Sequence, residues 1–190
     1  MTVYGIALFD LVFFVLVTGG FLLGFVQGTI RRLLGIASMM VSFFLAANLR
    51  GSLGDLVSGD WTQWPAGYST MLMFGATFIV LMVLSTILIQ GLYHRAPVVA
   101  DSEWIDEVLG GILGVVQALL IAGIVILILG SYFGLASTTY DPDEFLFLRN
   151  TWDAIAHSAV GVFYVGTLIP IFLGLSGPFI PASLRQLFAA

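Results

Sequence analysis

The chain has 190 residues, of which 59% are hydrophobic and 9% are charged, whereas soluble domains carry about a quarter charged residues. This composition excludes an ordinary soluble domain, and the net charge of -5, from six arginines, no lysine and eleven acidic residues, excludes a nucleic-acid partner, which requires a basic surface. Cysteine is absent, which excludes disulfides, thiol nucleophiles and cysteine metal ligands.

The first predicted membrane span runs from Leu11 to Gln27, without a charge. Its length is at the short end of what crosses a bilayer, and the helix can begin earlier because residues 1–9 are apolar too. No basic region precedes it, so we expect a retained span and not a signal peptide. Small residues recur at four-residue spacing at Gly20, Gly24 and Gly28, a pattern that favours close helix packing.

Asp10 is the single charge in residues 1–30. A carboxylate inside the membrane would be a candidate functional group. A carboxylate in the first helical turn, near the lipid head groups, would instead satisfy free backbone amides. The second interpretation is favoured.

The second predicted span covers Leu33 to Leu49 and follows the pair Arg31-Arg32. Only residues 28–30 separate it from the first span, which predicts a tight helical hairpin. Its own small-residue stripe consists of Ser38, Ser42 and Ala46.

A polar connection over residues 50–66 carries Trp61 and Trp64, which are typical of a membrane interface. The third predicted span covers residues 67–92 and ends before Pro97, which cannot continue a helix. An acidic loop then leads to the fourth span.

The fourth predicted span runs from Asp106 to about Gly130, without a charge after Glu107. The two acids lie at its start, where the helix dipole favours negative charge. One face carries a third stripe of small residues, Gly110, Gly114, Ala118 and Ala122.

The remaining residues, 135–190, form an acidic loop and a tail. Residues 154–175 carry no charge, but Pro170 and a polar side favour a helix lying in the membrane interface; a fifth span is the alternative. A short helical turn is expected at 183–188. The predicted fold is therefore all-α: a polytopic bundle of four transmembrane helices in residues 1–134, followed by a C-terminal interfacial helix.

The arginines predict the orientation of the bundle. With four spans, Arg31, Arg32 and Arg95 lie in the connections on one side. The other side has Arg50 in a connection and Arg149 and Arg185 in the tail. Arginine in short loops favours the cytoplasm, so the N-terminus and the acidic tail are expected outside.

Two patterns carry a family resemblance. The first consists of Asp10, Gly24, Gly28, Arg31, Leu33, Leu34 and Ala46. The second consists of Asp106, Leu109, Gly110 and Gly114. Their order and spacing resemble the CvpA family, bacterial inner-membrane proteins named for colicin V production, over about residues 6–130. The resemblance implies a four-span inner-membrane protein with both termini on the outer side.

Two positions depart from the family pattern. Glu107 and Gln117 stand where relatives often have basic residues. If those basic groups carry function in relatives, this chain lacks it or supplies it differently.

No catalytic, cofactor or metal site is predicted. The two histidines, His94 and His157, have no second ligand at metal spacing. The acids between residues 101 and 107 could bind a divalent cation, but a solvated loop is favoured.

We therefore expect a non-enzymatic membrane protein of the CvpA type, an accessory factor in colicin V-like toxin production or secretion and in envelope homeostasis. It would contact membrane lipids and form a homo-oligomer or a subunit of a membrane complex. A small transporter or channel is the alternative, with Asp10, Asn48, Gln90 and Gln117 available to line a path.

Overall fold

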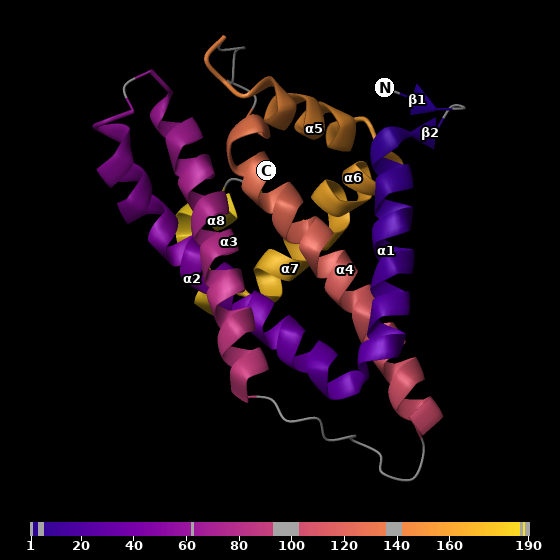
Figure 1. Cartoon of the computed structure of the whole chain (residues 1–190). Coiled ribbons are helices and arrows are strands. Elements are labelled where there is room, and N and C mark those ends of the chain that lie inside the picture. The colour runs from indigo at the N-terminus through magenta and orange to yellow at the C-terminus, as the bar shows by residue number, and fades with distance from the viewer. Residues whose placement is uncertain are drawn as a thin grey trace.

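Four long apolar helices dominate the computed structural model, which describes residues 2–3, 6–61, 63–92, 103–135, 142–186 and 188 (Figure 1). They are α1 (Leu8–Gln27), α2 (Thr29–Ser58), α3 (Ala66–Leu92) and α4 (Glu103–Phe133). All four are long and apolar enough to cross a membrane. The all-α fold with four spans is confirmed, with one addition before α1: a short antiparallel pair, β1 (Thr2–Val3) and β2 (Ile6–Ala7).

The helices pair as α1 with α4 and α2 with α3, and α2 also crosses α4. The bend predicted between the first two spans is present at Gly28, but the tight hairpin is wrong because α1 and α2 diverge from the bend (Figure 1). The small-residue stripes of α1 and α2 pack against different helices. The stripe of α1 faces α4, and the stripe of α2 faces α3.

The α2–α3 contact is polar at its centre. Ser38 and Ser42 of α2 lie with their hydroxyls 2.5 and 3.1 Å from that of Ser85 on α3, and Ser85 donates to the backbone of its own helix. Around this contact Met39, Phe43, Tyr68 and Phe74 are fully buried. Short side chains let the two backbones approach while the hydroxyls remain hydrogen-bonded.

Helix α2 is longer than predicted. Residues 51–58, expected in a polar connection, continue the helix to Ser58. The reason is packing, since a Cβ added at Gly54 would lie 2.6 Å from the Thr70 hydroxyl of α3. The two helices therefore remain in contact beyond the apolar part of α2.

The C-terminal part is helical but broken. It consists of α5 (Leu146–Ala156), α6 (Ala159–Phe163), the π-helical turn η1 (Tyr164–Leu168), α7 (Ile169–Leu175), η2 (Gly177–Phe179) and α8 (Ala182–Gln186). The single helix predicted over 154–175 is interrupted after Ala156, where the axis bends by 77°. Ser158 accepts a hydrogen bond from Gly161 N and starts the new helix. The wide turn of η1 precedes Pro170, which lacks an N–H for regular α-helical bonding.

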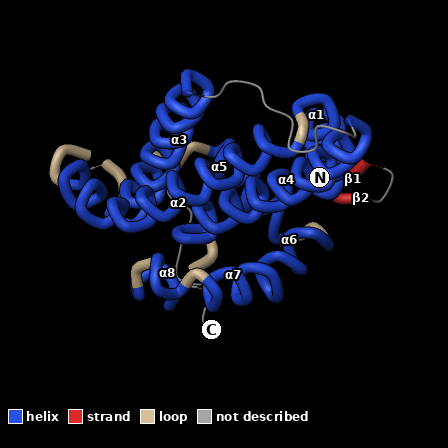
Figure 2. The backbone as a smooth tube through the Cα atoms, turned by 90° about the horizontal axis from the view of Figure 1, so that it is seen from below, coloured by secondary structure: helices blue, strands red, loops and turns tan. Residues whose placement is uncertain are grey.

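The segment from α6 to α8 lies along one side of the four long helices (Figure 2). It starts beside Asp10 at the beginning of α1, and the Tyr164 hydroxyl donates to the Leu119 carbonyl of α4 at 3.0 Å. Phe188 then lies against Gly130, near the end of α4. Because α1 and α4 are antiparallel, Asp10 and Gly130 lie at the same end of the bundle. The segment therefore runs partway along the side of the bundle and returns to the end where it began.

Candidate functional site

The candidate site is the contact between α1 and α4, where the small-residue stripes of the two helices face each other. Gly20 lies opposite Gly114 and Ala118, and Gly24 lies opposite Gly110. A Cβ added at Gly24 would overlap the Gly110 carbonyl oxygen, and one added at Gly114 would overlap the Gly20 carbonyl oxygen. The two backbones are therefore in direct contact, and only glycine allows them to come this close.

The end of this contact beside Gly28 is closed by Asp106. Its carboxylate accepts a hydrogen bond from Thr29 N at 3.4 Å, and the Thr29 hydroxyl donates to the Asp106 carbonyl at 3.0 Å. Gly28, with φ of 76°, turns the chain from α1 into α2. Asp106 of α4 thus caps the start of α2, a role that an N-cap residue normally fills within its own helix.

The opposite end of the contact is closed by Asp10. Its carboxylate oxygens accept hydrogen bonds from Ala159 N at 3.3 Å and Val160 N at 3.1 Å. Asp10 therefore satisfies free backbone amides, as favoured from the sequence, but those amides belong to α6. Asp10 and Asp106 thus lie near the starts of α1 and α4, and each caps a helix outside this pair: Asp10 caps α6 and Asp106 caps α2.

Of the two adjacent arginines, Arg31 is exposed and Arg32 is buried. Arg32 Nη1 donates to the side-chain oxygen of Gln117 on α4 at 2.7 Å, and its Nε has no partner among the described residues. Gln117, a departure from the family pattern, thus supplies the acceptor for a buried cation. Arg31 is the member of the family pattern and shares the helical face of Ser38, whereas Arg32 points to α4 and was not singled out from the sequence.

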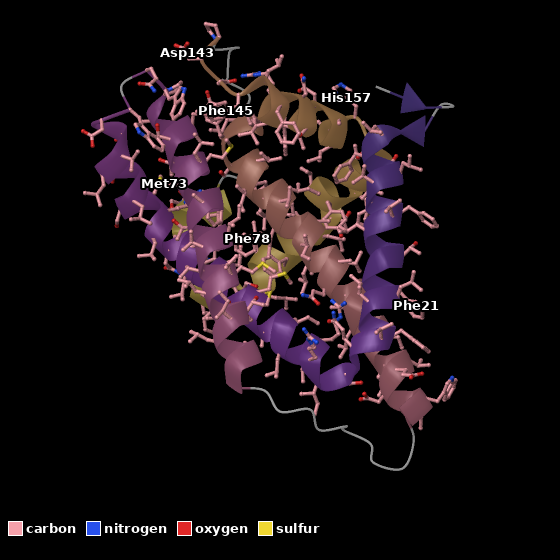
Figure 3. The ribbon with its side chains drawn as sticks, in the orientation of Figure 1. Phe21, Met73, Phe78, Asp143, Phe145 and His157 are labelled. Atoms are coloured by element: carbon pink, nitrogen blue, oxygen red, sulfur yellow. The ribbon has the colours of Figure 1, made fainter. Side chains whose placement is uncertain are left out.

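A second polar cluster, not predicted from the sequence, joins α5 to the far ends of α3 and α4. The buried Glu144 carboxylate accepts from the Tyr132 hydroxyl at 2.6 Å and from Arg149 Nε at 2.8 Å. The Tyr68 hydroxyl accepts from Phe145 N at 2.9 Å, and Figure 3 shows Phe145 at the start of α5 beside these helices. The guanidinium of Arg149 lies 5.3 Å from the ring centre of Phe133. These contacts fasten α5 across the end of the bundle.

Replacing Asp106 by alanine is expected to lower the stability of the protein by about 1 kcal/mol, the usual cost of losing an N-cap. The Thr29 amide would lose its side-chain acceptor. Thermal unfolding of the purified protein in detergent measures the change. Glu107→Ala is the matched control, because it removes the neighbouring carboxylate and leaves this cap in place; equal losses in both variants would contradict the assigned role.

His94 and Asp101 lie outside the described residues. His157 lies at the end of α5, where its Nδ1 is 2.7 Å from the Asp153 carbonyl.

Comparison with known proteins gave one match. A family model described as "Colicin V production protein" matches residues 9–153. No curated protein and no solved structure matched the chain. The matched residues include both capping aspartates, both facing glycine stripes and the Glu144–Arg149 pair.

Proposed function

Because the chain belongs to the colicin V production protein family, we propose that it is a non-enzymatic, multi-pass accessory protein in the production or secretion of a colicin V-like toxin. We place it in the bacterial inner membrane and assign it a role in envelope homeostasis. The observation that supports this proposal is the α1–α4 contact. The glycines and aspartates in the family-matched region build contacts and caps between helices of this chain, which supports a structural role for them in the bundle.

The proposal includes assembly with a second copy of the chain or with another membrane protein. The three small-residue stripes of α1, α2 and α4 are used within the chain, so they do not supply the docking surface. An open surface exists on the C-terminal segment, where a Cβ added at Gly166 or Gly174 would meet nothing within 4 Å. Both glycines are exposed, and small residues on an exposed helix surface allow another helix to come close.

Crosslinking in native membranes, followed by purification and identification of the products, tests this function. We expect a dimer of the chain or one defined membrane partner, and we expect Gly166→Leu to reduce the crosslinked fraction. Gly19→Leu is the control, because Gly19 is also open and lies on α1. A protein that stays monomeric in detergent and captures no partner contradicts the proposal.

The orientation proposed from the arginines places the N-terminus and the acidic tail outside. Since the chain has no cysteine, single cysteines report topology without background. Ser52→Cys is expected to react with a membrane-impermeant maleimide in intact cells, and Ser102→Cys is expected to react only after permeabilisation. The reverse pattern would invert the topology.

A further inference from the structure

A groove of about 1040 Å³ lies between α1, α4 and α5. Its floor is apolar and includes Val12 and Leu16 of α1 and Ile121 and Val125 of α4. Val12 and Val125 are 55% and 40% exposed, so the groove leaves apolar surface open. An acyl chain fits such a surface, because apolar side chains in a membrane protein are covered by lipid when no helix covers them.

One edge of the groove is polar. It is formed by α5, whose side chains Asn150, Asp153 and His157 line the groove and follow one helical face. Figure 3 places His157 next to the beginning of α1, near the end where α5 crosses the bundle. The groove thus combines an apolar floor with a polar edge at the end of the spans, which matches the two parts of a phospholipid.

The polar edge offers acceptors to a ligand. His157 Nδ1 lies 2.7 Å from the Asp153 carbonyl, and because a carbonyl can only accept, this nitrogen carries the proton. In the neutral ring Nε2 is then an acceptor. The exposed carboxylate of Asp153 is a second acceptor, and among the described residues no arginine or lysine lines the groove. This edge therefore attracts a cation with N–H donors and repels an anion.

We propose that the groove binds a phospholipid whose head group carries a primary amine. Its ammonium group donates hydrogen bonds to Asp153 and His157, and one acyl chain lies along α1 and α4. The Asn150 amide, one helical turn before Asp153, is a donor for the phosphate. Bulk lipid would occupy the groove without preference, so recognition of the head group is the distinguishing property.

Native mass spectrometry of the full chain, titrated in detergent with lipids of identical acyl chains, tests the proposal. Phosphatidylethanolamine is expected to bind roughly tenfold more tightly than phosphatidylglycerol, since a charge-assisted hydrogen bond contributes about that much. Phosphatidylcholine has the same head-group charge as phosphatidylethanolamine but no N–H. It is therefore expected to bind as weakly as phosphatidylglycerol.

Two variants and a control distinguish recognition of the head group from binding of the acyl chain in the groove. Asp153→Asn is expected to reduce phosphatidylethanolamine binding to the level of phosphatidylcholine, with an unchanged melting temperature because the side chain is exposed. Val125→Trp fills the groove and is expected to weaken binding of all three lipids. Asp60→Asn, which changes an exposed carboxylate outside the groove, should change nothing. Equal binding of the three lipids, or a preference that survives Asp153→Asn, would overturn the proposal.

Discussion

Gly24→Ala is expected to destabilise the protein by about 1–3 kcal/mol, the range seen when an extra methyl is forced into a packed site. The new Cβ would overlap the Gly110 carbonyl oxygen, and a backbone atom cannot rotate away as a side chain can. Helices α1 and α4 would have to move apart along their whole contact. Unfolding of the purified protein, followed by circular dichroism as denaturing detergent is added, measures the loss.

Gly19→Ala provides the matched control, one residue away on the same helix. A Cβ at Gly19 meets nothing within 4 Å, and alanine is better than glycine in a helix by about 1 kcal/mol. This variant should therefore be as stable as the parent or slightly more stable. Equal destabilisation of the two variants would show that the glycine stripe is not a contact.

Gly114→Leu extends the same test from the other helix. The larger side chain at a position that faces the Gly20 backbone should cost more than Gly24→Ala. Leu22→Ala, at a side chain that is 59% exposed, serves as the comparison and should cost little. Similar expression and stability of these two variants would argue against the glycine contact between α1 and α4.

Glu144→Leu is expected to cost about 3–5 kcal/mol, the usual loss when one partner of a buried ion pair is removed. Arg149 would lose its carboxylate, and the Tyr132 hydroxyl would lose its acceptor. Helix α5 would then be less firmly attached to the ends of α3 and α4. The same denaturation experiment measures the effect.

A double-variant cycle identifies the ion pair as the cause. Replacing both charged residues, Glu144→Leu with Arg149→Leu, removes the pair as a whole and can be nearly neutral. We expect the double variant to be more stable than Glu144→Leu alone. Strictly additive losses would show that the two side chains do not depend on each other.

The spans and their small-residue stripes could be predicted from the sequence because hydropathy and four-residue spacing are local properties. The stripes of α1, α2 and α4 lie at helix contacts as expected. Which stripe meets which could not be predicted, since that choice depends on the path of the chain beyond each helix. The tight hairpin failed for this reason: Gly28 redirects the chain, and α1 packs on α4 instead of α2.

Which helices Asp10 and Asp106 cap could not be predicted from the sequence either. Asp10 caps a helix that starts 149 residues later, and Asp106 caps one that starts 77 residues earlier. Spacing along the chain carries no information about such pairs. Arg32 could not be identified either, because it faces α4, whereas the stripe of Ser38 and Ser42 faces α3 and is in register with Arg31.

The most direct test of the α1–α4 contact is disulfide formation between two introduced cysteines. A Cβ added at Gly20 would lie 3.0 Å from the Ala118 Cβ and 2.7 Å from the Gly114 carbonyl oxygen. The helices must therefore separate slightly, which brings the two Cβ atoms toward the separation of about 3.5–4.5 Å found in bonded cysteines. Gly20→Cys with Ala118→Cys, in a chain that has no other cysteine, is therefore expected to crosslink on mild oxidation. Gly19→Cys with Ala118→Cys should not. No crosslink in the first pair, or equal crosslinking in both pairs, would contradict the packing of the two motifs against each other.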